Sequence, residues 1–310
     1  MAKPPDELVF APLGGVGEIG MNLGLYGFGN SNKRKWIIAD LGVSFADERL
    51  PGIDVIMPDI RFIADERENL LGIFLTHAHE DHFGAILHLW PVLRAPVYAT
   101  PFSAALLRAK IEEEPNAPDV KIREVALGGS VNAGPFHVEY VSTTHSIPEP
   151  NSLIITTDVG TVLHTGDWKI DSDPLLGKEM DQNRFEALGK AGCRAMICDS
   201  TNVFRPGVSP TEGEVAKVLE DLIQSAPYRV AVTSFASNVA RLRSAILAAE
   251  KAGRRTILGG RSMHRMINVA VDTGYLDDIP PFASMEEFSS LDRSKVMLLL
   301  TGSQGEPRAA

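Results

Sequence analysis

The sequence has little cysteine and no hydrophobic run long enough to cross a membrane. Cys193 and Cys198 are its only two cysteines, and the four residues between them fit neither a CxxC redox pair nor a disulfide framework. We therefore predict that both lie in the core or in strands and bind no metal. The longest apolar runs, such as Val296–Leu300, are far shorter than a membrane span, and the first residues carry no signal-peptide pattern. These features predict a soluble, cytoplasmic protein without a membrane partner.

Basic charge is also scarce, because 30 lysines and arginines face 40 aspartates and glutamates, a net charge of −10. That balance alone disfavours a nucleic-acid partner, since phosphate binding needs a basic surface. The excess acid, however, lies entirely in residues 1–205, whereas residues 206–310 hold 12 groups of each sign. From Arg229 to Arg265, eight basic residues accompany Glu250 alone. This basic segment is either a solvated helix face or a surface for phosphates.

The stretch HAHEDH, residues 77–82, contains three histidines and two acidic residues, and it follows a short apolar run. A buried strand that ends in polar residues places them at its carboxyl edge, where irregular backbone can direct several side chains to one point. Side chains alternate along extended chain, so His77 and His79 project together, while Asp81 and His82 serve a neighbouring point. Two adjacent metal ions are therefore expected. Imidazole and carboxylate ligands without thiolate suit zinc, with manganese or iron as alternatives.

A glycine pattern near the amino terminus offers a different interpretation. Gly15, Gly17 and Gly20 match GxGxxG, and Asp40 lies at the distance expected of a ribose-binding acid. A dinucleotide site of this kind requires a helix after the glycines. Residues 23–28 instead alternate like a strand and lead into turn-forming residues, which is typical of a hairpin. We therefore reject a dinucleotide-binding dehydrogenase.

Two further polar residues follow predicted strands in the way that HAHEDH does. His145 comes just after the alternating segment 136–141, and Asp167 ends a later apolar run. Because these strand ends repeat one placement, we expect them to converge on the same site as HAHEDH. His164, three residues before Asp167, is expected to support a ligand and not to bind metal itself.

The residues after 206 predict a parallel sheet. Strands over 229–233, 255–258 and 296–300 alternate with helices over 238–252 and 262–271, and this βαβαβ order implies crossover connections. Ligands of such sheets bind beyond the carboxyl ends of the strands, where helix amino termini offer free N–H groups. The candidates there for binding phosphate or RNA are Ser234, Ser237, Asn238, Arg261, Ser262 and Ser303. Ordinary cap and turn roles are the alternative for each of them.

Together these motifs resemble the metallo-β-lactamase superfamily, and in particular its ribonuclease J branch, which carries a β-CASP insert. HAHEDH and HTGDWK resemble the metal motifs, GGVGEIGMN resembles a stretch near the active site, and SFASNVARL, GGRSMHRMI and TGSQGEPRAA resemble the β-CASP insert. The resemblance implies an α/β fold with two domains. A metallo-β-lactamase αββα sandwich would occupy residues 1–205, and a partial β-CASP domain with a Rossmann-like parallel sheet would occupy residues 206–310.

The resemblance also implies roles for the site residues. The expected metal ligands are His77, His79, Asp81, His82, His145 and Asp167. Asp167 would bridge two ions, and Asp40 would orient the ligands from behind them. Two Zn²⁺ ions are expected, with Mn²⁺ or Mg²⁺ as alternatives. In the family a further histidine, beyond the position of Ala310, completes the second metal site, so that site is expected to be incomplete here.

The implied activity is hydrolysis of RNA phosphodiester bonds, both from a 5′ end and internally, in RNA decay and in processing such as that of rRNA. Asp81 and Asp167 are the expected catalytic carboxylates. The implied partners are single-stranded, 5′-monophosphorylated RNA and further copies of the chain in a homodimer or homotetramer. A DNA-directed β-CASP nuclease and an RNA-binding protein with little catalysis are the alternatives. A small-ester hydrolase is disfavoured, because it needs neither the βαβαβ insert nor the basic segment.

Overall fold

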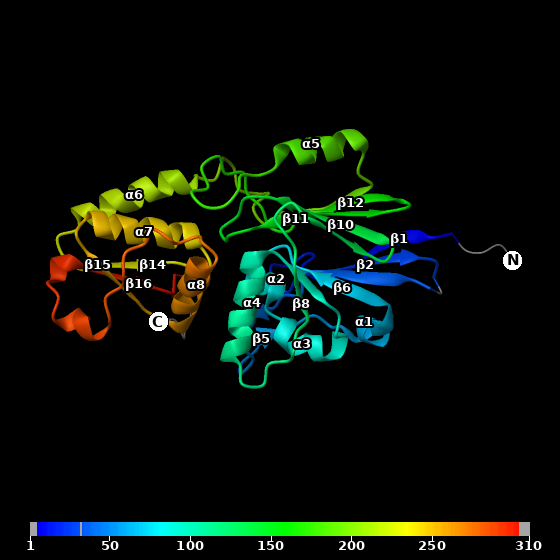
Figure 1. The fold of residues 1–310 in the computed structure, drawn as a ribbon, viewed down its shortest axis with the longest axis horizontal. Coiled ribbons are helices and arrows are strands. Elements are labelled where there is room, and N and C mark those ends of the chain that lie inside the picture. Colours follow the sequence, from blue (N-terminus) through cyan, green and yellow to red (C-terminus); the bar gives the residue numbers. More distant parts are fainter. Residues whose placement is uncertain (1–4, 32, 304–310) are drawn as a thin grey trace. The chain divides into compact units, whose positions relative to one another are not determined.

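The structure is a computed structural model that describes residues 5–31 and 33–303 (Figure 1). Its internal contacts divide the chain into two compact units. The first unit comprises residues 1–143, 149–169 and 180–206, and the second comprises residues 207–310 with the short segments 144–148 and 170–179. Among the described residues, no helix combines the length and the apolar character needed to cross a bilayer.

A six-stranded sheet forms one layer of the first unit. Its strand order is β1-β2-β3-β6-β7-β8, antiparallel as far as β3 and parallel from there on. The strands are β1 (Glu7–Gly14), β2 (Leu23–Gly29), β3 (Lys35–Ala39), β6 (Leu70–Phe74), β7 (Val97–Ala99) and β8 (Ile122–Glu124). β6 lies inside the sheet, and the chain that leaves its carboxyl end carries HAHEDH.

A five-stranded sheet with the order β13-β12-β11-β10-β9 forms the second layer. Its strands are β9 (Ser130–Ala133), β10 (Phe136–Ser142), β11 (Asn151–Thr157), β12 (Gly160–His164) and β13 (Ala195–Ile197). The core between the two sheets contains Tyr26, Phe74, Phe136 and Tyr140, whose side chains are almost completely buried. Each such aromatic ring stabilises the sandwich by roughly 1.5–3 kcal/mol relative to an exposed ring.

Helices cover the outer faces of both sheets (Figure 1). α5 packs Leu188 against the outer face of the five-stranded sheet, and α4 contacts β7 and β8 of the other sheet. The helices of this unit are α1 (Arg61–Asp65), the 3₁₀ helix η1 (Arg67–Asn69), α2 (Glu80–Phe83), α3 (Ile86–Leu93), α4 (Pro101–Glu113) and α5 (Gln182–Ala191). This layering confirms the predicted αββα sandwich.

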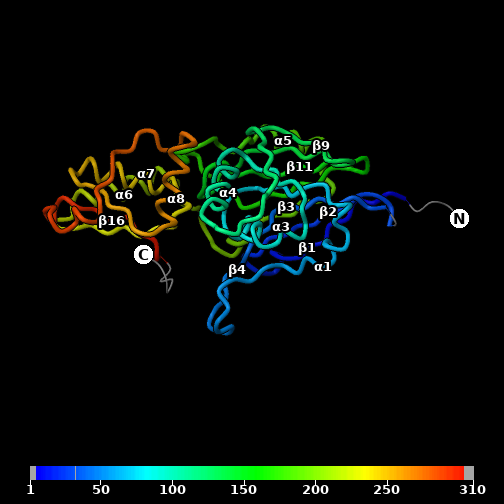
Figure 2. Tube along the Cα trace, turned by 60° about the horizontal axis from the view of Figure 1, so that its bottom comes forward, coloured from blue at the N-terminus to red at the C-terminus, as the bar shows by residue number. Residues whose placement is uncertain are grey.

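One connection of the first unit tests a prediction, and another forms a small hairpin. Residues 15–22 form a loop between β1 and β2 without a helix, so the rejection of a dinucleotide fold is confirmed. A small hairpin, β4 (Ser44–Phe45) with β5 (Val55–Ile56), projects from the sandwich (Figure 2).

The predicted core position of the two cysteines is wrong. Both Cys193 and Cys198 are exposed, and they flank the short strand β13. Within the described residues β13 is an edge strand, because it pairs with β12 alone. An edge strand with one neighbour leaves much of its side-chain surface open, so residues in and beside β13 are exposed.

The second unit contains a three-stranded parallel sheet with the order β14-β16-β15. Its elements are α6 (Glu212–Ser225), β14 (Val230–Thr233), α7 (Val239–Lys251), β15 (Arg255–Leu258), α8 (Arg261–Asp272), the 3₁₀ helices η2 (Glu286–Ser289) and η3 (Arg293–Lys295), and β16 (Val296–Leu300). α6 begins with a capping box, in which Thr211 and Glu214 satisfy each other's backbone N–H groups. The predicted parallel βαβαβ arrangement is therefore confirmed.

Candidate metal centre

Backbone hydrogen bonds hold HAHEDH on two sides. Its carbonyl groups accept from Asn22 N at Asp81 (2.9 Å), from Leu41 N at His82 (2.7 Å) and from Val43 N at Glu80 (3.0 Å). A Cβ atom at Gly42 would lie 1.7 Å from the Asp81 carbonyl oxygen, so only glycine allows this approach. The path of the ligand-bearing segment is thus set by neighbouring backbone as well as by β6.

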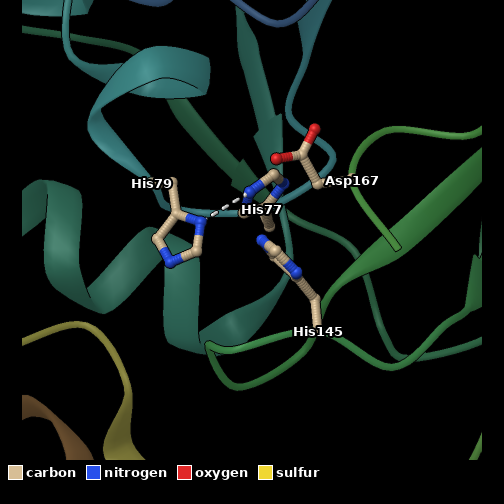
Figure 3. A group of neighbouring side chains, drawn as sticks. All are labelled: His77, His79, His145 and Asp167. Carbon is tan, nitrogen blue, oxygen red and sulfur yellow. Dashed lines mark hydrogen bonds between the residues drawn. The ribbon is translucent and has the colours of Figure 1, made fainter. Parts of the chain in front are cut away.

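The first group of ligand atoms comes from four side chains whose nitrogen and oxygen atoms lie within 4.8 Å of one another. They are His77, His79, His145 and Asp167 (Figure 3). His77 Nε2 lies 3.0 Å from His79 Nδ1, which shows how closely the two imidazoles approach. The structure therefore brings together the strand-end residues that the sequence predicted to converge.

The second group contains Asp81, His82 and Asp167. His82 Nε2 lies 3.1 Å from an oxygen of Asp167 and 3.5 Å from an oxygen of Asp81. Asp167 belongs to both groups, so its carboxylate is placed where it could touch two ions at once. Glu80, the remaining acid of HAHEDH, pairs with Lys110 and lies in neither group.

Asp40 belongs to neither ligand group but contacts both, His82 directly and His77 through Thr76. It is completely buried, has a left-handed backbone with φ 63°, and accepts hydrogen bonds from Thr76 N (2.7 Å) and Thr76 Oγ1 (2.8 Å). Because that hydroxyl donates to Asp40, it must accept from His77 Nδ1 at 2.9 Å. His82 Nδ1 likewise donates to Asp40 at 2.7 Å. The imidazoles of His77 and His82 are thereby oriented with Nε2 toward the other members of their ligand groups, where it could bind a metal.

His164 lies behind the second group and is a member of neither. Its Nδ1 is 3.0 Å from the hydroxyl of Tyr26, and its Nε2 is 3.9 Å from Asp40. Burial lowers the pKa of His164, so the neutral imidazole is favoured. Burial and the nearby charge of Asp40 raise the pKa of Tyr26, which keeps its hydroxyl protonated.

A pocket of about 350 Å³ opens beside the second group. Its lining includes the glycine loop, defined here as residues 14–20, and the side chains of Asp81, His82 and Asp167. Residues 197–201 and Phe204 also line it. The ligand groups are therefore accessible to a small molecule.

The sequence patterns included every member of the two ligand groups, but they did not mark two residues that contact them. Thr76 links Asp40 to His77, and the amide of Asn22 donates to the Asp81 carbonyl at 3.0 Å and lies 3.1 Å from His82 Nε2. No spacing rule marks either residue, because both act through contacts between distant segments.

Metal binding at the second group is expected to strengthen with rising pH. Burial opposes a charge on His82, but attraction by Asp40 and hydrogen bonds to Asp167 and Asp40 outweigh it and raise the pKa of the imidazole well above its usual value. Burial also raises the pKa of Asp81. Because an ion must displace these protons, affinity falls as pH falls.

Calorimetric titration with Zn²⁺ at several pH values, in buffers of different ionisation enthalpy, measures this effect. We expect release of about one proton per ion near neutral pH. His137→Gln alters a histidine that is exposed and outside both groups, and it should leave the pH dependence unchanged. An affinity independent of pH would contradict the prediction.

The predicted phosphate-binding residues of the second unit differ in their burial and in their position relative to the helices. Ser234 is buried and donates to the Phe235 carbonyl, and Asn238 is the N-cap of α7, where its side chain accepts from Arg241 N. Ser237 lies just before α7. Arg261 and Ser262 open α8, which has no side-chain cap, and Arg261 is exposed. Ser303 is exposed, whereas residues 304–310 of the last motif lie outside the described part of the chain.

Ion pairs neutralise much of the basic segment. Four of its eight basic side chains pair with carboxylates that lie elsewhere in the sequence: Arg241 with Glu212, Arg243 with Asp278, Lys251 with Glu220, and Arg255 with Glu287. A fifth, Arg254, is buried and donates to three backbone carbonyl groups at and just beyond the end of α6. The cationic surface is therefore much smaller than the count of charges suggested.

Comparison with known proteins agrees with these features. A model described as "Beta-lactamase superfamily domain" matches residues 51–188, and one described as "Ribonuclease J, beta-CASP domain" matches residues 227–310. Ribonuclease J of Sinorhizobium meliloti is 53% identical over 98% of the chain. The chain belongs to the ribonuclease J family. This confirms the family suggested by the motifs.

Other ribonuclease J sequences show the same relationship. The proteins of Mycolicibacterium smegmatis and Thermus thermophilus are 42% and 37% identical, over 99% and 98% of the chain. The chain spans about half the length of these curated relatives, 54% in each of the three cases. A crystal structure of a protein of unknown function from Enterococcus faecalis superposes with a TM-score of 0.61 and 16% identity, over 92% of this chain and 76% of that one. The latter likeness concerns the fold alone.

Proposed function

We propose that this chain carries the metal centre of a metal-dependent ribonuclease, with residues 1–205 as its lactamase-type domain and residues 206–310 as part of its β-CASP domain. The observation that supports it most is the pair of ligand groups that share Asp167 beside an open pocket, in a chain of the ribonuclease J family. The proposed reaction is hydrolysis of RNA phosphodiester bonds, both from a 5′ end and internally, in the cytoplasm.

The donor set fits two divalent ions. Imidazole nitrogens with carboxylate oxygens suit Zn²⁺ or Mn²⁺, whereas Mg²⁺ prefers oxygen ligands. When bound, such ions would supply Lewis-acid charge for a phosphoryl oxygen and make water more acidic. His77, His79 and His145 would hold one ion with Asp167, and Asp81 and His82 would hold the other with Asp167.

The chain's own residues would organise the reaction around that centre. Asp167 would fix the spacing of the ions, since it belongs to both groups. Asp81 would hold one ion and orient the attacking water in the pocket that it lines. Asp40 would keep both imidazoles turned toward the phosphate site.

The experiment that tests this proposal compares two matched substrates. The purified chain is analysed for bound metal and incubated with a 5′-monophosphorylated RNA and with DNA of the same sequence. We expect metal-dependent cleavage of the RNA, and none with a chelator. Faster cleavage of the DNA would favour the DNA-directed alternative, and stable RNA binding without metal or turnover would leave a binding role only. Light scattering of the same sample tests the homodimer or homotetramer that the resemblance implies.

Arg261 is expected to contribute to RNA affinity. It is exposed at the start of α8, whereas Arg255 of the same unit is paired with Glu287. Arg261→Ala should raise the Kd for single-stranded RNA several-fold and reduce the salt slope of log K by about 0.7, the loss of one phosphate contact. Arg255→Ala removes an equal charge and serves as the control. Equal effects of the two substitutions would contradict a specific role for Arg261.

A further inference from the structure

Three of the apolar side chains that line the pocket are strongly exposed, and two of them belong to the glycine loop. Val16 is 64% exposed and Ile19 is 75% exposed, and both line the pocket. Phe204, which also lines the pocket, is 97% exposed. Exposed apolar side chains that line a ligand-sized pocket indicate a ligand with apolar faces. They do not contribute to the buried core, so folding does not account for them.

The loop is held firmly in place at its base. Met21 N donates to the Val43 carbonyl at 2.9 Å, and Gly15 N donates to Glu18 Oε1 at 3.1 Å. A Cβ atom at Gly15, whose φ is +82°, would lie 2.3 Å from the side-chain oxygen of Asn22. Asn22 in turn contacts the carbonyl of Asp81. The loop therefore stands at a fixed place beside the second ligand group.

The pocket combines two kinds of chemistry at that place. Its lining includes the ligand groups Asp81, His82 and Asp167, which suit a phosphate through bound ions, and it also includes the exposed apolar side chains. A nucleotide has the same two parts, an anionic phosphate and a base with apolar faces. A pocket of about 350 Å³ is at the lower end of the size range of ligand sites, which suits one nucleotide.

We propose that Val16, Ile19 and Phe204 form a nucleoside subsite that holds the base next to the phosphate bound over the second ligand group. This inference rests on the proposed function. The base would stack on Phe204 and lie against the two aliphatic side chains. Every base has apolar faces, so the subsite would accept all four bases with little sequence preference.

The test compares two ligands that differ only by the base. Adenosine 5′-monophosphate and ribose 5-phosphate are titrated by calorimetry into the chain loaded with Mn²⁺. We expect the nucleotide to bind about tenfold more tightly than the sugar phosphate, the effect of one stacked base. Phe204→Ala and Ile19→Ser should each remove most of that difference and leave the affinity for ribose 5-phosphate unchanged.

Val159→Ser is the matched control, because Val159 is 37% exposed and does not line the pocket. It should bind both ligands as the parent chain does. Equal affinities of the two ligands for the parent chain, or Phe204→Ala and Ile19→Ser variants that retain the preference for the nucleotide, would overturn the proposal. Hydrolysis of bis(p-nitrophenyl) phosphate, measured separately, tests the proposed function. If the parent chain does not hydrolyse this substrate but still binds the nucleotide more tightly than the sugar phosphate, the proposed nuclease activity is overturned and the nucleoside subsite is not.

Discussion

Asp167→Ala is expected to lower phosphodiester hydrolysis about 10³-fold, which corresponds to about 4 kcal/mol of transition-state stabilisation. Asp167 belongs to both ligand groups, so its loss weakens the binding of two ions at once. A ligand that belongs to one group, such as His79, should have a smaller effect on metal content. The measurements are steady-state hydrolysis of an RNA oligomer and metal content by mass spectrometry after dialysis.

The control for this substitution is Asp158→Ala, since Asp158 is exposed in the turn between β11 and β12. It should retain both metal content and hydrolysis. An Asp167→Ala variant that binds two ions and hydrolyses RNA at a rate near that of the parent chain would exclude the bridging role. A variant that loses hydrolysis but keeps both ions would assign Asp167 to the chemistry alone.

Asp40→Ala is expected to destabilise the first unit by about 3 kcal/mol and to weaken metal binding by roughly 10–100-fold. The substitution removes the carboxylate that accepts from Thr76 and from His82, and it leaves those buried donors unsatisfied. His82 would then lose the partner that fixes its ring. Thermal unfolding in the presence of a chelator measures the loss of stability without any contribution from metal.

Asp40→Asn separates the shape of the side chain from its charge. Asparagine tolerates the left-handed backbone at this position and fills the same space, so most of the stability should be retained. Its amide nitrogen cannot accept a hydrogen bond, so one of the present donors loses its partner and metal affinity should still fall. Asp40→Asn with unchanged metal affinity would show that the carboxylate does not position the ligands.

The proximity of the candidate ligands was predictable because they follow strands. Side chains at the ends of β6, β10 and β12 stand in irregular chain, and this pattern marked His145 and Asp167 as well as HAHEDH. The role of Thr76 was not predictable from pattern, and Asn22 was marked only as part of GGVGEIGMN, without its contacts. Their contacts depend on where separate segments meet, and that information is three-dimensional.

In the basic segment, too, contacts between distant parts of the chain could not be predicted from the sequence. The charge count along residues 229–265 left two interpretations open, a solvated helix face and a surface for phosphates. The acidic partners Glu212, Glu220, Asp278 and Glu287 lie outside that window, so the count did not include them. The parallel sheet itself was predictable, because its strands and helices have clear periodicity and α6 has a capping box. Charge balance on a surface depends on packing between elements, which a local count does not describe.

The hydrogen bonds that hold residues 80–82 against Asn22 and the segment 41–43 have a consequence for metal supply. The ligand side chains are carried by chain whose path is set by protein contacts and not by an ion. The centre should therefore lose its ions and take them up again without refolding. Where several divalent metals compete, an empty centre of this kind takes whichever the cell provides at the highest ratio of concentration to dissociation constant. The metal content of the centre would then follow the metal supply of the cell at the rate of ion exchange, which is faster than the synthesis of new protein.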